Sequence, residues 1–291
     1  MVEENYEQIE RRRILQPKND IVFQTLFGKG KENITKAMLE DILKIKIHKI
    51  DLDKNKDLLN DRKEQKNGRV DVRAIINDNV ECDIEIQLAT HERMIERFLY
   101  YWAKMYTANL KVGNQYNKLR KTISIIIVGE EIEQFKEIPQ AHTKWQLREK
   151  KYQNIVLTEF CELHIITLPK AIQEYQNNKE DAMLQWMMFL DNPENKEVAE
   201  IMEANKDIKA AKEELDRINQ DEILWKEALD IEITRMDNEQ FLYEARRDGI
   251  KEGKKEAKLE AAKKMLEENA SIEFVMKVTG LTKEEIETLN S

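Results

Sequence analysis

The stretch VECDIEIQL, residues 80–88, decides the fold, because polar and apolar side chains alternate along it without interruption. Side chains of a β-strand point to opposite faces in turn, so the three acids and the glutamine share one face. The acidic face is formed by Glu81, Asp83, Glu85 and Gln87, and the other face is wholly apolar. An amphipathic strand with a row of acids raises the question of what neutralises them.

A second alternating run, RVDVRAII (69–76), precedes this strand and is separated from it by Asn77, Asp78 and Asn79. The pattern predicts a β-hairpin in which Asp71 lies directly across from Glu85. Like charges in directly opposed positions destabilise a sheet, so a cation is expected between them. Two such carboxylates suit Mg²⁺ or Mn²⁺. The alternative is an ordinary solvent-exposed face.

The flanking segments predict helices and further strands in alternation. The expected helices cover 20–27, 32–45 and 92–111, and the expected strands cover 46–53, 122–128, 152–157 and 163–168. Pro169 is expected to end the sheet, and the chain beyond it has helical periodicity almost throughout. These patterns predict an α/β fold followed by helices.

Four segments in this order resemble the PD-(D/E)XK nuclease superfamily, and more narrowly its recombination-promoting nuclease or putative transposase branch. They are PKNDIVFQTLFG (17–28), DIEIQL (83–88), RFLYYWAKMY (97–106) and LHIITLPK (163–170). The resemblance covers most of the chain. It implies a restriction-endonuclease-like core, a mixed central sheet flanked by helices, over residues 1–175, and a helical C-terminal region over 176–291.

The same resemblance implies a metal-dependent DNA endonuclease. It assigns Asp71, Glu85 and the backbone carbonyl of Ile86 as ligands of Mg²⁺ or Mn²⁺, with Asp20 as an additional acidic ligand. Gln87 occupies the usual lysine position, where an amide can hydrogen-bond the attacking water but adds no positive charge. The alternative is a catalytically silent nuclease-fold protein that binds DNA or assembles through its helical tail.

The distribution of charge makes DNA a reasonable partner despite a net charge of −9. Residues 180–291 hold 17 basic and 29 acidic residues, whereas residues 1–179 hold 31 and 28. Residues 88–129 carry a local net charge of +5. Within that segment the residues expected to hold the DNA backbone, with slight sequence preference, are Arg93, Arg97, Tyr101 and Lys104. The alternative for each is a solvated helix face.

The C-terminal region carries two further expectations. Its charged run contains an apolar series predicted to form a narrow seam in a homo-oligomer, with a dimer favoured: Ile250, Leu259, Ala262 and Leu266. The tail SIEFVMKVTGLTKEEIETL (271–289) predicts two short helices that fit a DNA-reading unit. Its acidity favours helical packing or self-association instead, because phosphate contact requires the opposite charge.

Other features bound the location and the chemistry. The two cysteines, Cys82 and Cys161, lie in apolar runs, which fits a reducing compartment. The first twenty residues lack the apolar core of a signal peptide, and no window approaches a membrane span, so a cytoplasmic protein is expected. The four histidines show no ligand spacing, which disfavours a zinc site or a histidine-based triad.

Overall fold

The computed structural model describes residues 15–53, 72–89, 92–108, 110 and 113–289. Contacts divide the chain into two compact units, Met1–Leu229 and Asp230–Ser291. The domain boundary predicted after residue 175 stays a prediction, but the helices that follow it belong by their contacts to the first unit. Each unit is described by itself below.

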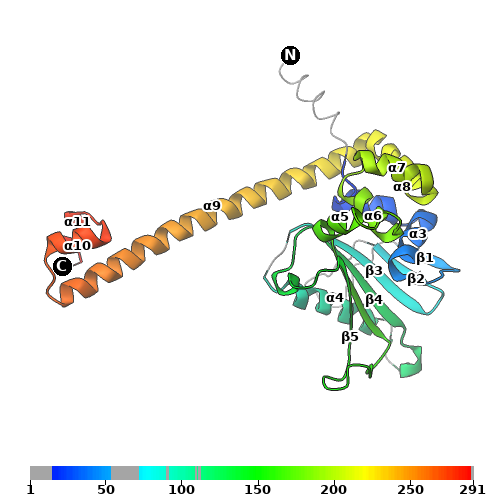
Figure 1. The fold of residues 1–291 in the computed structure, drawn as a ribbon, viewed down its shortest axis with the longest axis horizontal. Helices are drawn as coiled ribbons and strands as arrows, with labels where there is room; N and C mark the ends of the chain where they lie inside the picture. Colours follow the sequence, from blue (N-terminus) through cyan, green and yellow to red (C-terminus); the bar gives the residue numbers. More distant parts are fainter. Residues whose placement is uncertain (1–14, 54–71, 90–91, 109, 111–112, 290–291) are drawn as a thin grey trace, which may run out of the picture. The chain divides into compact units, whose positions relative to one another are not determined.

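The first unit is built on one mixed six-stranded sheet in the order β1-β2-β3-β4-β6-β5 (Figure 1). Its strands are β1 (Ile50–Asp53), β2 (Val72–Ile76), β3 (Val80–Gln87), β4 (Lys121–Val128), β5 (His142–Gln146) and β6 (Cys161–Thr167). β1, β2 and β3 pair antiparallel, β3, β4 and β6 pair parallel, and β5 pairs antiparallel with β6. The predicted α/β fold with a mixed central sheet is confirmed.

The hairpin register agrees with the prediction wherever both strands are described. Val72 pairs with Ile84 and Ile76 pairs with Val80, as a three-residue turn requires. Asn77 and Asp78 have positive φ angles of 52° and 63°, a conformation that Asn and Asp adopt more readily than most residues. Residues 54–71, which include Asp71, lie outside the described residues.

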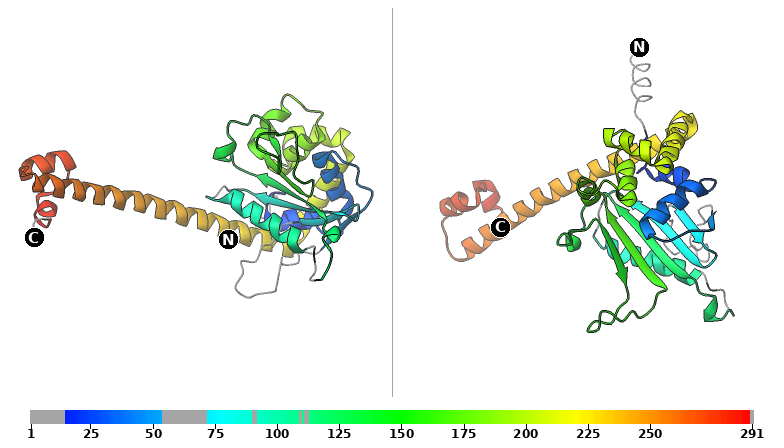
Figure 2. Two further views of the ribbon diagram at one scale, coloured as in Figure 1. Left: turned by 90° about the horizontal axis from the view of Figure 1, so that it is seen from below. Right: turned by 45° about the vertical axis from the view of Figure 1, so that its right-hand side comes forward.

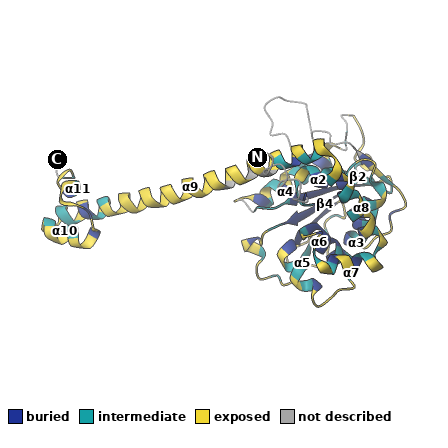
Figure 3. Cartoon of the chain, turned by 90° about the horizontal axis from the view of Figure 1, so that it is seen from above, coloured by how far each residue is buried: buried dark blue, intermediate teal, exposed yellow. Residues whose placement is uncertain are grey.

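Helices cover both faces of this sheet (Figures 1 and 2). They are α2 (Asp20–Phe27), α3 (Glu32–Leu43), α4 (Met94–Ala108), α5 (Leu168–Tyr175), α6 (Ala182–Asp191), α7 (Lys196–Ala204) and α8 (Lys206–Gln220), with short 3₁₀ turns η1 (Tyr116–Lys118) and η2 (Glu133–Phe135). α4 packs on one face through Met94 and Phe98. The other helices join the apolar side chains of β2, β3 and β4 in the main core, as the dark strands of Figure 3 illustrate.

The segment that begins at Pro17 is held by helices from much later in the chain. Asn19 caps α2 by accepting a hydrogen bond from the Ile21 amide at 3.1 Å, and its side-chain amide donates to the Ala228 carbonyl at 3.1 Å. Lys18 forms an ion pair with Asp191 of α6 at 3.0 Å. The helices after residue 175 therefore complete the core of the first unit.

The prediction of a strand over 152–157 was wrong. The partner of β6 is β5, and residues 147–160 form an irregular loop in which Val156 makes an isolated bridge with Arg148. Tyr152, Ile155 and Leu157 are exposed, so the apolar run that suggested a strand is not buried against a sheet face. The strand predicted over 163–168 is confirmed by β6, and Pro169 lies in the first turn of α5.

The second unit contains most of α9 (Glu222–Glu267) and two short helices, α10 (Ile272–Thr279) and α11 (Lys283–Glu287). Ala262 is buried against Val275 and Ile286, and Leu259 and Leu266 pack at the edge of the same cluster. Three members of the predicted oligomer seam are thus used inside the unit, whereas Ile250 is exposed. No helix of the described residues is long and apolar enough to cross a membrane.

Two histidines that are distant in sequence come together at the β5–β6 edge of the sheet. His142 Nε2 lies 2.7 Å from His164 Nδ1, and His164 Nε2 lies 2.8 Å from Glu162. Lys121 and Lys144 form ion pairs with the same carboxylate at 2.7 and 2.5 Å. Although burial opposes it, these hydrogen bonds hold the pKa of Glu162 well below its usual range. Neighbouring strands, not sequence spacing, create this cluster.

The His142 pair predicts a specific acid sensitivity. Burial, followed by the charges of His164 and Lys44, lowers the pKa of His142 to about 4 from an ordinary value of 6.5. The folded protein thus gains stability from neutral His142 above pH 6.5 and loses it as the pH falls towards 4. We expect the free energy of unfolding to fall by about 1–2 kcal/mol more in the wild type than in His142→Gln between pH 7 and 5.

Urea unfolding at both pH values measures this difference. The glutamine keeps an amide donor towards His164 but does not titrate. The variant therefore removes the charge change while it keeps the hydrogen bond. Equal losses in the two proteins would contradict the assignment of acid sensitivity to His142.

Candidate active site

The acidic row of β3 is buried within the fold. Glu81, Asp83 and Glu85 are 0%, 2% and 4% exposed. They point to the face covered by α4, since Glu85 pairs in register with Ile126, which packs beneath that helix. Buried carboxylates are costly unless they are paired, protonated or bound to a cation. Each of the three carboxylates interacts with a different side chain.

Asp83 is neutralised in part by a proton. The Ser124 hydroxyl on the adjacent strand β4 donates to Asp83 Oδ1 at 2.5 Å. Burial raises the pKa of Asp83 to about 7, and the charge of Glu85 pushes it in the same direction, while the Ser124 hydrogen bond opposes both. Near neutral pH this carboxyl is therefore present in both protonation states.

Glu85 is paired with a cation from α4. Arg97 donates from Nη2 to Glu85 Oε1 at 2.8 Å, and its guanidinium carbon lies 5.4 Å from the centroid of the Tyr101 ring. The helix is fixed against the sheet by Trp102, whose Nε1 donates to the Thr122 carbonyl at 3.0 Å. α4 thus places a positive group directly on one of the predicted metal ligands.

Glu81 and Arg73 form the third pair, which crosses from β3 to β2. Arg73 opposes Asp83 in the register, so it reaches Glu81 diagonally. The second carboxylate oxygen of Glu81 and the Nε atom of Arg97 are buried and have no hydrogen-bond partner among the described residues. The face therefore retains hydrogen-bonding capacity that the described residues do not use.

A glycine contacts the backbone at the end of the acidic strand β3. Gly129 directly follows β4 and donates to the Gln87 carbonyl at 2.9 Å. A Cβ atom at this position would lie 2.7 Å from the Leu88 carbonyl oxygen, so only glycine fits without a backbone shift. Gln87 Nε2 donates to the Ala89 carbonyl at 3.1 Å. Its side-chain oxygen is therefore the atom suited to accept a hydrogen bond from water.

The other predicted site residues lie at several places. Ile86, predicted to act through its backbone carbonyl, has its side chain in the main core. Asp20 is an exposed first residue of α2, a helix of the opposite layer. Arg93 is exposed just before α4 with a φ of 63°, and Lys104 is buried on that helix. Asp71, the first of the predicted ligands, lies outside the described residues.

The residues present fit a divalent cation. The donors on this face are carboxylate oxygens, which Mg²⁺ and Mn²⁺ prefer, and a buried row of them is stabilised by positive charge. Among the residues that the structure describes, no three His, Cys, Asp or Glu side chains converge in ligand geometry. The predicted metal site includes Asp71, which lies outside the described residues.

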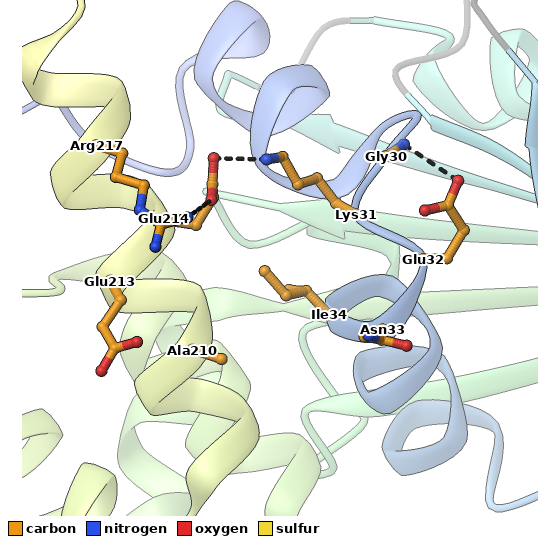
Figure 4. A pocket seen from close by; sticks show the side chains of 9 residues that line it. All are labelled: Gly30, Lys31, Glu32, Asn33, Ile34, Ala210, Glu213, Glu214 and Arg217. Carbon is orange, nitrogen blue, oxygen red and sulfur yellow. Dashed lines mark hydrogen bonds and ion pairs between the residues drawn. The ribbon is translucent and has the colours of Figure 1, made fainter.

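A pocket of about 390 Å³ lies elsewhere, between the α2–α3 turn and α8 (Figure 4). Its charged residues largely neutralise one another: Lys31 pairs with Glu214 at 2.6 Å, and Arg217 pairs with the same carboxylate at 3.3 Å. Because α3 and α8 cover the opposite face of the sheet from Glu85, this pocket is no part of the acidic site. The turn with Gly28 and Gly30 separates α2 from α3, in agreement with the two helices predicted over 20–27 and 32–45.

The sequence did not single out Arg73, Ser124 or Gly129. Ser124 interrupts an otherwise apolar strand and Gly129 ends it, so both had a weak signal in TISIIIVG (122–129). Their function depends on which residue of β3 lies beside them. Only the parallel pairing of β3 and β4 shows that.

The sheet order, the acidic strand and the crossing helix define a nuclease-like α/β domain of the restriction-endonuclease type. The family model of the PD-(D/E)XK nuclease family transposases matches residues 17–245. The chain belongs to this family. Comparison with curated proteins gave no match, and comparison with solved structures gave none either.

A second family model describes the tail. The C-terminal helix-turn-helix domain of the Rpn/YhgA-like nuclease family matches residues 255–291. Thr282 caps α11 in a full capping box with Glu285, and Gly280 turns the chain with a φ of 68°. The match supports the DNA-reading interpretation of the tail that its acidity had disfavoured.

Asp83 provides a test of the electrostatics of this face. Because its folded pKa of about 7 exceeds the ordinary 3.8, neutral Asp83 stabilises the fold at low pH, and this stability is lost as the pH rises from about 4 through 7. We expect the melting temperature of Asp83→Asn, relative to the wild type, to rise by several degrees between pH 5 and pH 8 in the presence of a chelator.

Asparagine retains an oxygen acceptor for Ser124 and cannot ionise, so the variant isolates the charge. Ser124→Ala, which removes the hydroxyl, is the matched variant and should leave a pH dependence at least as large as that of the wild type. A difference between Asp83→Asn and wild type that does not change with pH would contradict the raised pKa.

Proposed function

We propose that this protein is a metal-dependent DNA endonuclease that hydrolyses phosphodiester bonds, with a role in recombination or mobile DNA. The observation that carries the proposal is the buried acidic row of β3 with Arg97 on Glu85, in a chain of a nuclease family. A row of buried acids beside a fixed cation has little value for packing alone. It is suited to binding a cation and a phosphate.

In this mechanism Asp71, Glu85 and the Ile86 carbonyl would hold Mg²⁺ or Mn²⁺, and Asp20, on a helix of the opposite layer, is left out of the ligand set. The bound ion supplies a water activated near neutral pH and a charge sink for the phosphorane. Gln87 accepts a hydrogen bond from that water and orients it. Its amide nitrogen is already held by Ala89, which fixes the direction of its oxygen.

Arg97 takes over the charge that a lysine at position 87 would supply. It donates a hydrogen bond to Glu85, so its guanidinium lies beside the predicted ligand. With a metal ion held by Glu85, Arg97 would be the residue beside it that contacts a phosphate oxygen. Arg93, Tyr101 and Lys104 on or beside the same helix hold the DNA backbone.

The helix-turn-helix tail supplies a second DNA contact. Because the tail itself is acidic, this contact needs basic residues from α9 as well. Residues 241–267 of that helix carry 8 basic and 6 acidic residues.

We also propose a cytoplasmic location, which suits the free and buried thiols of Cys82 and Cys161.

A catalytically silent DNA-binding or assembly protein is the second candidate. The observation in its favour is the Glu85–Arg97 pair, which already neutralises a ligand, together with the missing lysine. In this case the acidic row would be structural. The two candidates differ in whether a divalent ion binds.

Cleavage of supercoiled plasmid in Mg²⁺ or Mn²⁺ tests the activity. We expect the wild type to cut and Asp71→Ala and Glu85→Ala to show no detectable cleavage, since each loses a ligand. Arg97→Ala should reduce the rate by about 100-fold, because it removes one preorganised positive group, and Arg97→Lys should restore part of it. Plasmid that stays intact with every protein would favour the silent candidate.

Metal binding is measured separately on the same proteins. An ion that binds only the folded state must stabilise it, so Mn²⁺ should raise the melting temperature of the wild type and not that of Asp71→Asn. Arg217→Ala, at the remote pocket, is the matched control and should keep both the shift and the cleavage. A shift that persists in Asp71→Asn would place the metal elsewhere.

We further propose that the chain forms a homodimer through the exposed part of α9. Met236, Tyr243 and Ile250 recur every seven residues, and all are exposed. Figure 3 shows α9 exposed along most of its length. Residues 222–240 carry 2 basic and 6 acidic residues, the reverse of the excess in 241–267, so charge favours two antiparallel copies.

Disulfide trapping tests this arrangement. In an antiparallel pair centred on Tyr243, position 236 of one copy lies near position 250 of the other. We expect a mixture of Met236→Cys and Ile250→Cys proteins to crosslink faster than either protein alone. Crosslinking of each variant with itself would indicate a parallel pair, and a monomer in light scattering would refute the dimer.

A further inference from the structure

The outer surface of α4 carries Tyr100, which the mechanism above does not use, next to Tyr101, which that mechanism places against the DNA backbone. We propose that Tyr100 and Tyr101 stack unpaired bases, so that the substrate of this site is DNA with single-stranded nucleotides. The inference rests on the proposed nuclease function and names its class of substrate. Four observations on α4 carry it.

The first observation is the density of aromatic residues. α4 holds five of the 20 aromatic residues of the chain within 15 positions. Three of them have structural roles, because Phe98 is buried and Trp102 stacks on Tyr106 at 5.2 Å while it donates to β4. Tyr100 and Tyr101 remain to be explained.

The second observation is exposure. Tyr100 is 43% exposed and the neighbouring Leu99 is 46% exposed, on a helix whose other apolar residues pack well. The ring centroids of Tyr100 and Tyr101 lie 5.9 Å apart with an angle of 53° between the planes. Two adjacent rings thus present different planes to one surface, which suits successive bases more than a single flat ligand.

The third observation is that each ring has its own cation. Lys104 Nζ lies 5.0 Å from the centroid of Tyr100, and the Arg97 guanidinium lies 5.4 Å from that of Tyr101. Lys104 is only 7% exposed, so its ammonium group is held in place. Aromatic faces next to fixed cations combine base stacking with phosphate attraction, which is how single strands are bound without sequence preference.

The fourth observation is the position beside the acidic row. Arg97 contacts Glu85 on β3, and it also contacts the ring of Tyr101, which lies one helical turn further along α4. A strand stacked on the tyrosines therefore runs past the predicted metal ligand. A duplex would leave the rings without a partner, because its bases are stacked on each other and it offers phosphates and base edges.

The test is fluorescence anisotropy with the full chain and three labelled probes of one sequence: single-stranded DNA, the DNA duplex and single-stranded RNA. Ca²⁺ replaces Mg²⁺ so that binding is measured without turnover. We expect the wild type to prefer the single DNA strand to the duplex. Tyr100→Ser should weaken single-strand binding by at least about fivefold and change duplex binding less than twofold.

Two variants sharpen the comparison. Tyr100→Phe keeps the ring and should restore single-strand binding, which a role of the hydroxyl group would not allow. Tyr116→Ser removes a tyrosine that is 81% exposed on η1, outside α4, and should behave as the wild type. Equal losses on both DNA probes, or no loss at all, would overturn the inference, and tighter binding of RNA would replace DNA as the substrate.

These outcomes separate the inference from the proposed function. Single-strand preference that depends on Tyr100 in a protein without cleavage activity would retain the binding surface and reject the nuclease. Plasmid cleavage that depends on Glu85 but not on Tyr100, with equal binding of both DNA forms, would retain the nuclease and reject the surface.

Discussion

The burial of three carboxylates on one strand is the constraint on which the rest of the site depends. Glu81, Asp83 and Glu85 lie in the middle of a sheet, between a layer of helices and α4, where an unpaired charge would cost several kcal/mol. Each carboxylate is stabilised by a different partner. Glu81 pairs with Arg73, Asp83 accepts a hydrogen bond from Ser124, and Glu85 pairs with Arg97. Each solution comes from a different neighbouring element, so the acidic row ties β2, β4 and α4 together.

Of these three solutions, the pairing of Glu85 with Arg97 has the greatest consequence for function. Arg97 lies on a helix and places a positive charge next to Glu85. In the proposed mechanism this charge replaces the one that a lysine at position 87 would supply, so Gln87 does not leave the site without a cation. The same arginine extends over Tyr101, which links the acid to the aromatic surface of α4. The proposed chemistry, phosphate contact and base stacking therefore all rely on the orientation of one helix, α4, whose Trp102 donates a hydrogen bond to the Thr122 carbonyl of β4.

The C-terminal half of the chain has two physical roles. Its first helices complete the core, where Trp186 is fully buried and donates from Nε1 to Asp41 at 2.9 Å, and burial raises the pKa of that carboxyl. Beyond residue 229, α9 leads to a small apolar cluster around Ala262 that supports the helix-turn-helix. The acidity of the tail agrees with this packing. It does not argue against DNA binding, because binding depends on the charges of the side chains that face the phosphates and not on the net charge of the module.

The sequence by itself determined the strands with strong alternation, the register of the hairpin and the family. A period of two in side-chain direction and a three-residue turn leave one pairing for VECDIEIQL, and that pairing is local. It also determined α4, where Met94, Phe98 and Met105 are buried and Ile95 and Trp102 are partly buried. Exposed loops were less predictable, since the apolar run 152–157 has the composition of a strand without a sheet to bury it.

Only the tertiary structure decided what stands beside each acid. Ser124 reaches Asp83 because β3 and β4 pair in parallel, and His142 meets His164 because β5 returns beside β6. Such contacts join residues more than twenty positions apart through a sheet order that sequence periodicity does not encode. Local patterns fix which side chains share a face, and long-range pairing fixes their neighbours, so the candidate site was visible in the sequence as a row of acids and became a chemical environment only in the fold.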